Sequence, residues 1–387
     1  MDSIQESDVL NAVKTKLPPC CLRIFRNKII LVGTYDLDKS TGYRSGSLDV
    51  FTMDLKLLCS NNTYGAILDL KLSPFDDTLI CTAHSTGNIM LWRIRCTDKD
   101  DFQPNELDIH AIANLQLFEK DVLIASCHFS PLDCKKLLVT NTAGEAATID
   151  IRTLSVQFTA SAIAQAYSKL DKIDYEVQGA TEKVIHVESG QFLKPHELEC
   201  WTAEFGSLQP FQDVVFTGGD DSRIMAHDLR SKEFIWSNNR IHDAGVVSIK
   251  CSQPNFRNNK PTSIITGSYD DNIRSLDLRM MGESIFPGAN VPTVNKLACD
   301  LGGGVWRFVE SPIDQEQSHH NGSDRLLVCC MYNGAKVVTM NDNSDEYFQI
   351  QHYLKKGHDS MCYGGDWSNS LIATCSFYDN SLQTWIV

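Results

Sequence analysis

Residues 241–249 read IHDAGVVSI, residues 263–273 read SIITGSYDDNI, and residues 276–279 read LDLR. The first segment predicts a loop with a histidine followed by a strand. The second predicts a strand that ends in small residues before a tight turn containing Asp270, because Asp, Asn and Gly accept the positive φ of hairpin turns. The third predicts another strand. In it Leu276-Asp277 occupies the place of the Trp-Asp pair that ends many repeats of about 40 residues.

The same three-part unit recurs along the chain, which is typical of a β-propeller of WD repeats. Clear copies span 214–230 and 371–385, and weaker copies span 28–51, 70–92, 128–152 and 305–331. With the unit at 241–279 these make seven. The sequence therefore predicts an all-β, seven-bladed WD-repeat β-propeller.

The last unit stops at Trp385-Ile-Val387, directly after its third strand. We expect the N-terminal segment around Leu10 to Leu17 to supply the fourth strand, because closing the ring leaves few strand edges exposed. Residues 1–387 are then a single propeller domain. The unusually long interval after Asp150 predicts an insertion, or a long outer strand and loop, at about 165–194, which is either a surface excursion or a partner-docking loop.

The net charge and the apolar runs of the chain limit the kinds of partner that it is expected to bind. The net charge of -14 argues against direct nucleic-acid binding, which needs clustered Lys and Arg. The start of the chain lacks the charge and apolar run of a signal peptide, and no later apolar run approaches about 18 residues. We therefore expect a cytoplasmic protein without membrane insertion. We also expect it to be monomeric. The 14 cysteines are expected to be reduced, and no zinc-like spacing predicts a metal or cofactor.

Common hydrolase and nucleotide-binding motifs are absent, so any catalytic set must be assembled across blades. Alignment of the units predicts that residues just before the turn Asp, and residues at the start of each inner strand, face the channel mouth. These residues are Asp220, Tyr269, Tyr332 and Tyr378 at the turns, and Glu199, Trp201, Trp306 and Tyr363 at the inner strands. An aromatic and acidic rim of this kind can hold a quaternary ammonium group through cation–π attraction.

This rim is expected only in the four C-terminal units, since the matching earlier residues Ser85, Ala66 and Leu68 are small or apolar. Each rim Tyr or Trp could instead be a packing residue with a hydrogen-bonded tip. His242 and His358 stand where WD repeats have a structural loop histidine, with general acid or base catalysis as the alternative. Arg307 is either a salt-bridge residue or an oxyanion stabiliser.

Several strings together resemble the eukaryotic diphthine methylesterase family of WD-repeat proteins. They are Glu199-Cys-Trp-Thr-Ala203, Thr217-Gly-Gly-Asp-Asp221, His242-Asp-Ala-Gly-Val246, Gly267-Ser-Tyr-Asp270, Gly302-Gly-Gly-Val-Trp-Arg307 and Tyr363-Gly-Gly-Asp-Trp367. The resemblance implies an enzyme of diphthamide biosynthesis. Its substrate is then translation elongation factor 2 carrying methylated diphthine, a modified histidine with a trimethylammonium group, and the reaction is hydrolysis of the methyl ester.

Our hypothesis assigns Trp201, Tyr269, Trp306 and Tyr378 to the trimethylammonium group, with Tyr332 and Tyr363 as further substrate-binding residues. Glu199 or Asp220, with His242 as a further candidate, would activate water, and Arg307 completes the catalytic candidates. A covalent route through Cys329 or Cys330 is disfavoured because both lie in an apolar strand. The competing function is a non-enzymatic WD-repeat scaffold in a translation-linked or trafficking complex.

Overall fold

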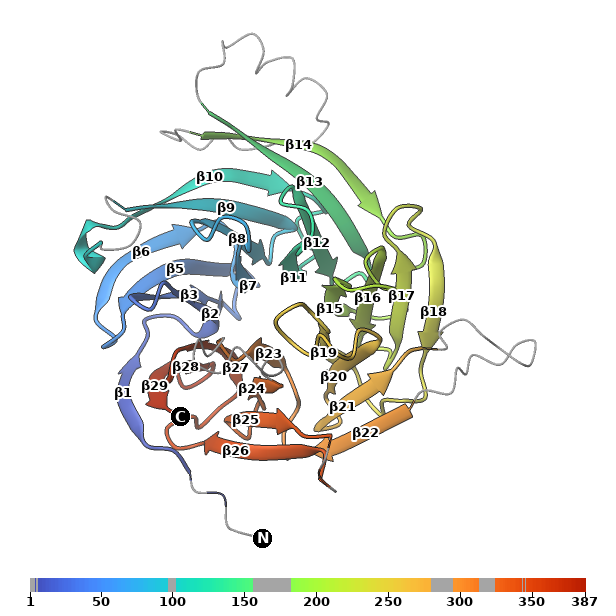
Figure 1. Ribbon diagram of the computed structural model, residues 1–387. Coiled ribbons are helices and arrows are strands. Elements are labelled where there is room, and N and C mark those ends of the chain that lie inside the picture. Colours follow the sequence, from blue (N-terminus) through green and yellow to red (C-terminus); the bar gives the residue numbers. More distant parts are fainter. Residues whose placement is uncertain are drawn as a thin grey trace.

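The computed structural model describes residues 4, 6–96, 102–155, 182–279, 295–312, 324–342, 344 and 346–387. They form seven antiparallel sheets that stand as blades around a central channel (Figure 1). This arrangement confirms the predicted all-β, seven-bladed propeller. We number the blades 1 to 7 along the chain, starting with the sheet that begins at Pro19.

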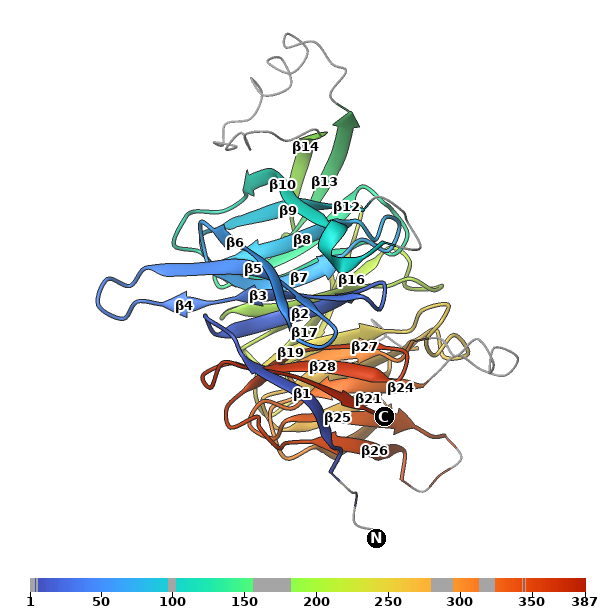
Figure 2. The ribbon, with the colours of Figure 1, turned by 90° about the vertical axis from the view of Figure 1, so that its left-hand side faces the viewer.

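Each blade has four main strands running from the channel outward (Figures 1 and 2). The innermost strands are β2 (Pro19–Phe25), β7 (Ile67–Leu72), β11 (Ile124–Phe129), β15 (Cys200–Phe205), β19 (Val246–Cys251), β23 (Arg307–Glu310) and β27 (Cys362–Ser368). The second strands are β3 (Ile29–Thr34), β8 (Leu79–His84), β12 (Lys136–Asn141), β16 (Val214–Gly219), β20 (Ser263–Ser268), β24 (Arg325–Cys329) and β28 (Leu371–Ser376).

The third strands are β5 (Arg44–Thr52), β9 (Asn88–Arg95), β13 (Ala146–Ser155), β17 (Ile224–Asp228), β21 (Asn272–Asp277), β25 (Ala335–Met340) and β29 (Ser381–Ile386). The outermost strands are β6 (Leu57–Thr63), β10 (Asp108–Gln116), β14 (Glu182–Gln191), β18 (Phe234–Asn238), β22 (Asn295–Asp300), β26 (Phe348–Leu354) and β1 (Val9–Lys14). A short strand, β4 (Asp36–Leu37), extends the hairpin into β5, and a short 3-10 helix, η1 (Pro104–Glu106), precedes β10.

The ring closes in blade 7, where the two ends of the chain lie side by side (Figure 1). Strand β1 pairs antiparallel with β29, with Val9 opposite Trp385 and Lys14 opposite Ser381. The N-terminal segment therefore supplies the outermost strand, as predicted, although the strand begins at Val9 and ends before Leu17. Pairing satisfies the backbone groups of β29 that would otherwise form an open edge.

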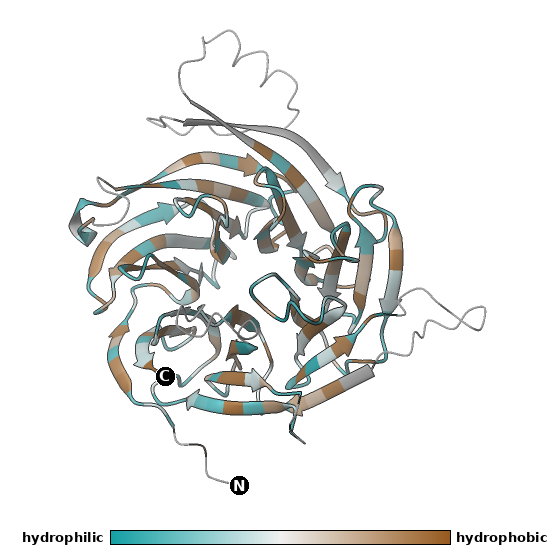
Figure 3. Ribbon diagram, in the orientation of Figure 1, coloured by the Kyte–Doolittle hydropathy of each residue, from teal (hydrophilic) through white to brown (hydrophobic). Residues whose placement is uncertain are grey.

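The apolar core lies between the blades. Among the described residues the buried apolar side chains form seven clusters, and each cluster joins two neighbouring blades. Second strands such as β3, β8, β16 and β20 are buried along their whole length, which explains their apolar sequences. Apolar colour accordingly runs along the strands, and polar colour gathers in the loops (Figure 3).

Histidines inside the blades hydrogen-bond to threonines of the second strands. His84 Nε2 lies 2.7 Å from Thr82 Oγ1, and His358 Nε2 lies 2.7 Å from Thr374 Oγ1. Burial lowers the pKa of both imidazoles to about 4, so they are neutral near pH 7. His358 therefore has the structural environment that the repeat predicts for a loop histidine.

The turn aspartates also stabilise the blades. Asp270 accepts hydrogen bonds from the backbone N–H of Asp243 (2.9 Å) and of Asn272 (3.1 Å). Asp221 and Asp379 accept backbone hydrogen bonds at the same turn of their own blades. Each aspartate ties the loop before the inner strand to the turn after the second strand, which fixes the geometry of the channel mouth.

Six of the seven inner strands carry a β-bulge at their second residue, where the register with the second strand shifts. The bulged residues are Cys20, Leu68, Ala125, Trp201, Val247 and Tyr363. In blade 6 the corresponding residue is Trp306, directly before β23. A bulge re-aims the side chain of the extra residue, and these side chains lie at one end of the channel.

Of the predicted insertion at 165–194, residues 165–181 lie outside the described residues. Residues Glu182–Gln191 form β14, which pairs with β13 as a long outer strand. Whether the insertion docks a partner stays a prediction, as does the single domain over 1–387. The 14 cysteines are all free, as expected. Within the described residues, no helix has the length and apolarity needed to span a membrane.

Candidate functional site: an aromatic rim above a charged channel

A continuous row of aromatic side chains lies at the channel mouth. Tyr269 stacks on Trp306 with ring centroids 5.9 Å apart, and Trp201 contacts both, at 6.4 Å from Tyr269 and 6.1 Å from Trp306. These three residues come from blades 4, 5 and 6. Trp201 and Trp306 reach each other because the bulged residue of blade 5, between them, is the smaller Val247. We call Trp201, Tyr269 and Trp306 the rim triad.

The carboxylate of Asp220 orients one member of the triad. The indole Nε1–H of Trp201 donates to Asp220 Oδ1 at 3.0 Å. Gly245 leaves room for this contact, since a Cβ there would lie 2.7 Å from Asp220 Oδ1 and 3.0 Å from a ring carbon of Tyr269. The aligned repeats predict Asp220, Trp201 and Tyr269 at one rim. In the structure Trp201 contacts both of the others.

Glu199 lies beside the same triad, just before β15. Its backbone oxygen accepts a hydrogen bond from the N–H of Asp220 at 2.8 Å. Burial raises the pKa of the Tyr269 phenol, and the negative charges of Asp220 and Glu199 add to that rise. The rim therefore combines aromatic faces with two nearby carboxylates, the combination that favours a cation.

The other predicted aromatic residues are less closely grouped. Tyr363 contacts Trp306, with centroids 5.0 Å apart. Tyr378 reaches the row only through Phe377, and its side chain is 71% exposed. Tyr332 is 62% exposed, and its backbone oxygen accepts a hydrogen bond from Lys355. The structure thus brings Trp201, Tyr269, Trp306 and Tyr363 together, with Tyr332 and Tyr378 at the periphery.

Two aromatic residues of this row were missed by the sequence analysis. Phe377 contacts Tyr363 at 5.4 Å and Tyr35 at 5.9 Å. The expectation that only the four C-terminal blades contribute is therefore wrong, because Tyr35 belongs to blade 1. Tyr35 directly follows β3, as Tyr269 directly follows β20, so the alignment of repeats contained the signal.

Below the rim, charged side chains line the channel. A cavity of about 310 Å³ is lined by Trp306 of the rim and by residues of the inner strands of blades 1 to 6. Its charged lining residues are Arg23, Lys71, Glu204, Lys250, Arg307 and Glu310. The signal in the sequence was the one or two charged residues inside each of these inner strands, and it was overlooked because a single strand does not reveal the channel.

Ion pairs across blades balance much of this charge. Lys250 of blade 5 lies 3.4 Å from Glu204 of blade 4 and also contacts Glu310 of blade 6. Arg307 of blade 6 reaches Asp69 of blade 2, with Nη1 3.0 Å from Oδ1. Burial alone would raise the pKa of Asp69, but the charges of Arg307 and Lys71 hold it well below its usual range. The salt-bridge role expected for Arg307 is thus present.

His242 lies inside its blade. Its side chain is buried, and Nε2 lies 2.9 Å from Thr266 Oγ1. This contact is the one that WD repeats predict, and it favours the structural role over general acid or base catalysis. The buried His196 of blade 4, which the sequence analysis did not single out, contacts Asp221 (2.8 Å) and Thr217 (2.9 Å) in the same way.

The chain is similar in sequence to proteins whose names refer to diphthine. The chain is 28% identical to "Diphthine methyltransferase" of Schizosaccharomyces pombe over 92% of this chain and 90% of that protein. It is 24% identical to "Diphthine methyltransferase homolog" of Dictyostelium discoideum, with 94% of each chain covered. It is 32% identical to "Diphthine methyltransferase" of Homo sapiens over 45% of this chain and 33% of that protein.

Two relatives that the chain matches along nearly their whole length thus bear a diphthine methyltransferase name. No family model matches the chain. Among solved structures, a chain of the "Crystal Structure of Mitotic Checkpoint Complex" superposes with a TM-score of 0.62 at 12% identity, covering 100% of this chain and 94% of that one. At this identity the likeness supports the propeller fold alone.

The strings that carried the family resemblance meet at the rim. Glu199-Cys-Trp201 opens β15, and Tyr269 follows β20. Gly302 to Arg307 leads into β23, and Tyr363 is the bulged residue of β27. These strings are distant in sequence but adjacent in the fold, which makes the rim the candidate functional site.

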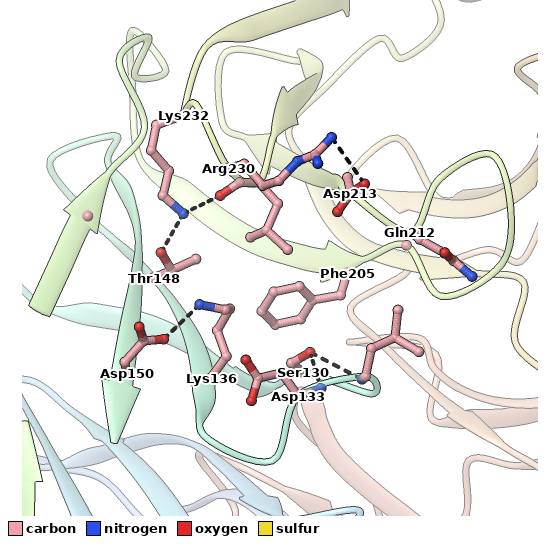
Figure 4. Close-up of a pocket in the computed structure, with 14 residues that line it drawn as sticks. Ser130, Asp133, Lys136, Thr148, Asp150, Phe205, Gln212, Asp213, Arg230 and Lys232 are labelled. Atoms are coloured by element: carbon pink, nitrogen blue, oxygen red, sulfur yellow. Dashed lines mark hydrogen bonds and ion pairs between the residues drawn. The ribbon is translucent and has the colours of Figure 1, made fainter. Parts of the chain in front are cut away.

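A larger cavity of about 600 Å³ lies between blades 3 and 4, at the opposite end of the inner strands (Figure 4). Each Lys and Arg side chain that lines it has a partner there, including Arg230, which pairs with Asp213 at 3.4 Å. Lys136 pairs with Asp150 at 2.7 Å, and Lys232 donates to Thr148 Oγ1 at 2.6 Å (Figure 4). Because these groups satisfy one another and lie away from the aromatic row, we place the candidate site at the rim.

The adjacent cysteines at the end of β24, the second strand of blade 6, do not suit nucleophilic chemistry. Cys329 and Cys330 are completely buried, and burial raises the pKa of Cys330 to about 12. Within the part of the chain that the structure describes, no group of three or more His, Cys, Asp and Glu side chains could hold a metal ion.

Substitution of Gly245 tests the geometry of the rim. Gly245→Ala introduces a Cβ against Asp220 and Tyr269, so the triad must shift. We expect tetramethylammonium, measured by tryptophan fluorescence, to bind about five-fold more weakly, which corresponds to roughly 1 kcal/mol of cation–π attraction. Gly190→Ala is the control, because its Cβ would come close only to the flexible end of Lys232, at 3.1 Å, and would be in ordinary contact with Thr148 Oγ1 at 3.7 Å. Unchanged affinity in folded Gly245→Ala would contradict the rim as a cation site.

Proposed function

We propose that the protein is a carboxylic-ester hydrolase of diphthamide biosynthesis that demethylates diphthine methyl ester to diphthine, releasing methanol. The observation that carries this proposal is the rim triad beside Glu199 and Asp220, in a chain whose relatives have names that refer to diphthine and methyl groups. We propose that the substrate is diphthine methyl ester on translation elongation factor 2, and that the reaction takes place in the cytoplasm.

The rim triad suits the trimethylammonium group of this substrate. Its three rings lie within 6.4 Å of one another, and a cation within about 6 Å of an aromatic centroid is attracted by the ring. The carboxylates of Asp220 and Glu199 add a favourable negative field. Tyr363, Tyr332 and Tyr378 extend the surface outward and would contact the protein chain around the modified histidine.

Glu199 is the better candidate to accept a proton from water. Asp220 already holds the indole N–H of Trp201. Among the described residues, the half-buried side chain of Glu199 has no hydrogen-bond or ion-pair partner. A free carboxylate beside the bound cation can take a proton from the water that attacks the ester carbon. Asp220 then acts as a positioning residue for Trp201.

The test is demethylation of purified elongation factor 2 that carries the methylated intermediate. We expect the modified peptide to lose about 14 Da, one CH₂, with release of methanol. Tyr269→Ala and Trp306→Ala should lose most turnover, whereas Phe75→Ala, an exposed aromatic residue just beyond the other end of an inner strand, should keep it. Wild-type protein that binds the factor and leaves its mass unchanged would indicate the alternative, a non-enzymatic scaffold.

The role of Glu199 has its own test. Glu199→Gln keeps the shape of the side chain and removes its basicity, so we expect kcat to fall by about 100-fold with KM within a few-fold of wild type. Asp220→Asn should instead raise KM, because it weakens the contact that orients Trp201. A Glu199→Gln enzyme with wild-type kcat would exclude Glu199 as the general base.

A further inference from the structure

The feature that points beyond the proposed function is a pair of buried N–H donors directly under the rim. Trp306 Nε1 and Arg307 Nε are both buried, and neither has a hydrogen-bond partner among the described residues. They belong to consecutive residues, and both residues line the cavity of about 310 Å³ below the rim. A buried donor without a partner destabilises a protein, so two of them on residues that line one cavity indicate a site that receives an acceptor.

The Arg307 guanidinium is held rigidly. Nη1 pairs with Asp69 Oδ1 at 3.0 Å, and Nη2 donates to the backbone oxygen of Leu68 at 3.2 Å. Both partners lie on β7 of blade 2, so the side chain crosses the channel from blade 6. Asp69 is itself fixed by Lys71 at 2.8 Å. Only Nε of the guanidinium has no partner, and the group cannot turn away from the cavity without breaking the ion pair.

The two donors lie close to the rim triad. The guanidinium carbon of Arg307 lies 5.8 Å from the centroid of the Trp306 ring, and the same ring stacks on Tyr269. When the cation of a ligand lies on the rim triad, a group a few bonds away in the same ligand can therefore reach these two N–H donors. In the proposed substrate the ester and the trimethylammonium group are carried by one modified side chain.

We propose that Trp306 Nε1–H and Arg307 Nε–H bind the carbonyl oxygen of the substrate's methyl ester and stabilise the negative charge that develops on it. This inference rests on the proposed function and assigns the oxyanion site of that reaction. Donors fixed before the reaction and kept away from water are the most effective stabilisers of such a charge.

Water adds to the ester carbon while one of its protons passes to Glu199, and the carbonyl electron pair moves onto the oxygen held by Trp306 and Arg307. When the carbonyl re-forms, the bond to the methoxy oxygen breaks, and that oxygen takes the proton from Glu199 and leaves as methanol. The resulting acid releases its remaining proton to solvent, and the product carboxylate stays opposite Arg307.

Trp306→Phe tests the inference because it keeps an aromatic ring in the triad and removes the N–H. We expect kcat on the methylated factor to fall by about 100-fold, the usual cost of one oxyanion donor, while the half-saturation concentration of tetramethylammonium changes less than three-fold. Trp236→Phe is the matched control. Trp236 also has a buried Nε1 without a partner among the described residues, but it lies on the outer strand β18, so its kcat should stay at the wild-type value.

Arg307→Lys provides the second variant, since it retains a positive charge facing Asp69 and lacks Nε–H. It should also lose about 100-fold in kcat with unchanged tetramethylammonium binding, and a thermal melt checks that it is folded. If folded Trp306→Phe and Arg307→Lys both turn over at wild-type kcat, the oxyanion site is wrong although the esterase stands. If the wild-type protein releases no methanol, the proposed function itself fails, so the two failures are distinguishable.

Discussion

The site depends on one backbone feature, the bulge at the second residue of the inner strands. In a regular strand this side chain would alternate with its neighbours, but the register shift adds a residue and turns it toward the channel mouth. The feature repeats from blade to blade, so the ring gathers residues that are distant in sequence. Trp201 and Tyr363 reach the mouth for this reason, Trp306 joins them from the corresponding residue directly before β23, and Tyr269 joins them from the end of a second strand.

The rest of the blade keeps this mouth rigid. Apolar clusters between neighbouring blades fix the spacing of the inner strands. Buried histidines such as His242 and turn aspartates such as Asp270 hold the loops that carry Gly245 and Tyr269. Below the mouth, ion pairs such as Arg307 with Asp69 cross the channel. An aromatic layer thus lies directly above a charged one, so a ligand with a quaternary ammonium next to a carboxyl group can be matched at both ends.

The sequence predicted the local features and missed those that depend on ring closure. Turn aspartates, small residues and apolar second strands recur in each unit, so the seven blades and the closing strand could be predicted. The rim was predicted because it follows from the alignment of the repeats. The same alignment, extended to the rim residues of the first unit, also predicts Tyr35 at the rim. The contact of Arg307 with Asp69 joins blades 6 and 2, and no repeat pattern reports which residues face each other across a channel.

We propose that the rim recognises positive charge on a methylated nitrogen. The most direct measurement is an NMR titration of the indole N–H signals of Trp201 and Trp306 with choline and with 3,3-dimethylbutan-1-ol, which has the same shape and no charge. We predict that choline shifts both signals at concentrations roughly ten-fold lower than the neutral alcohol, since cation–π attraction contributes about 1–2 kcal/mol. Equal responses to the two compounds, or shifts at tryptophans outside the rim alone, would contradict the account.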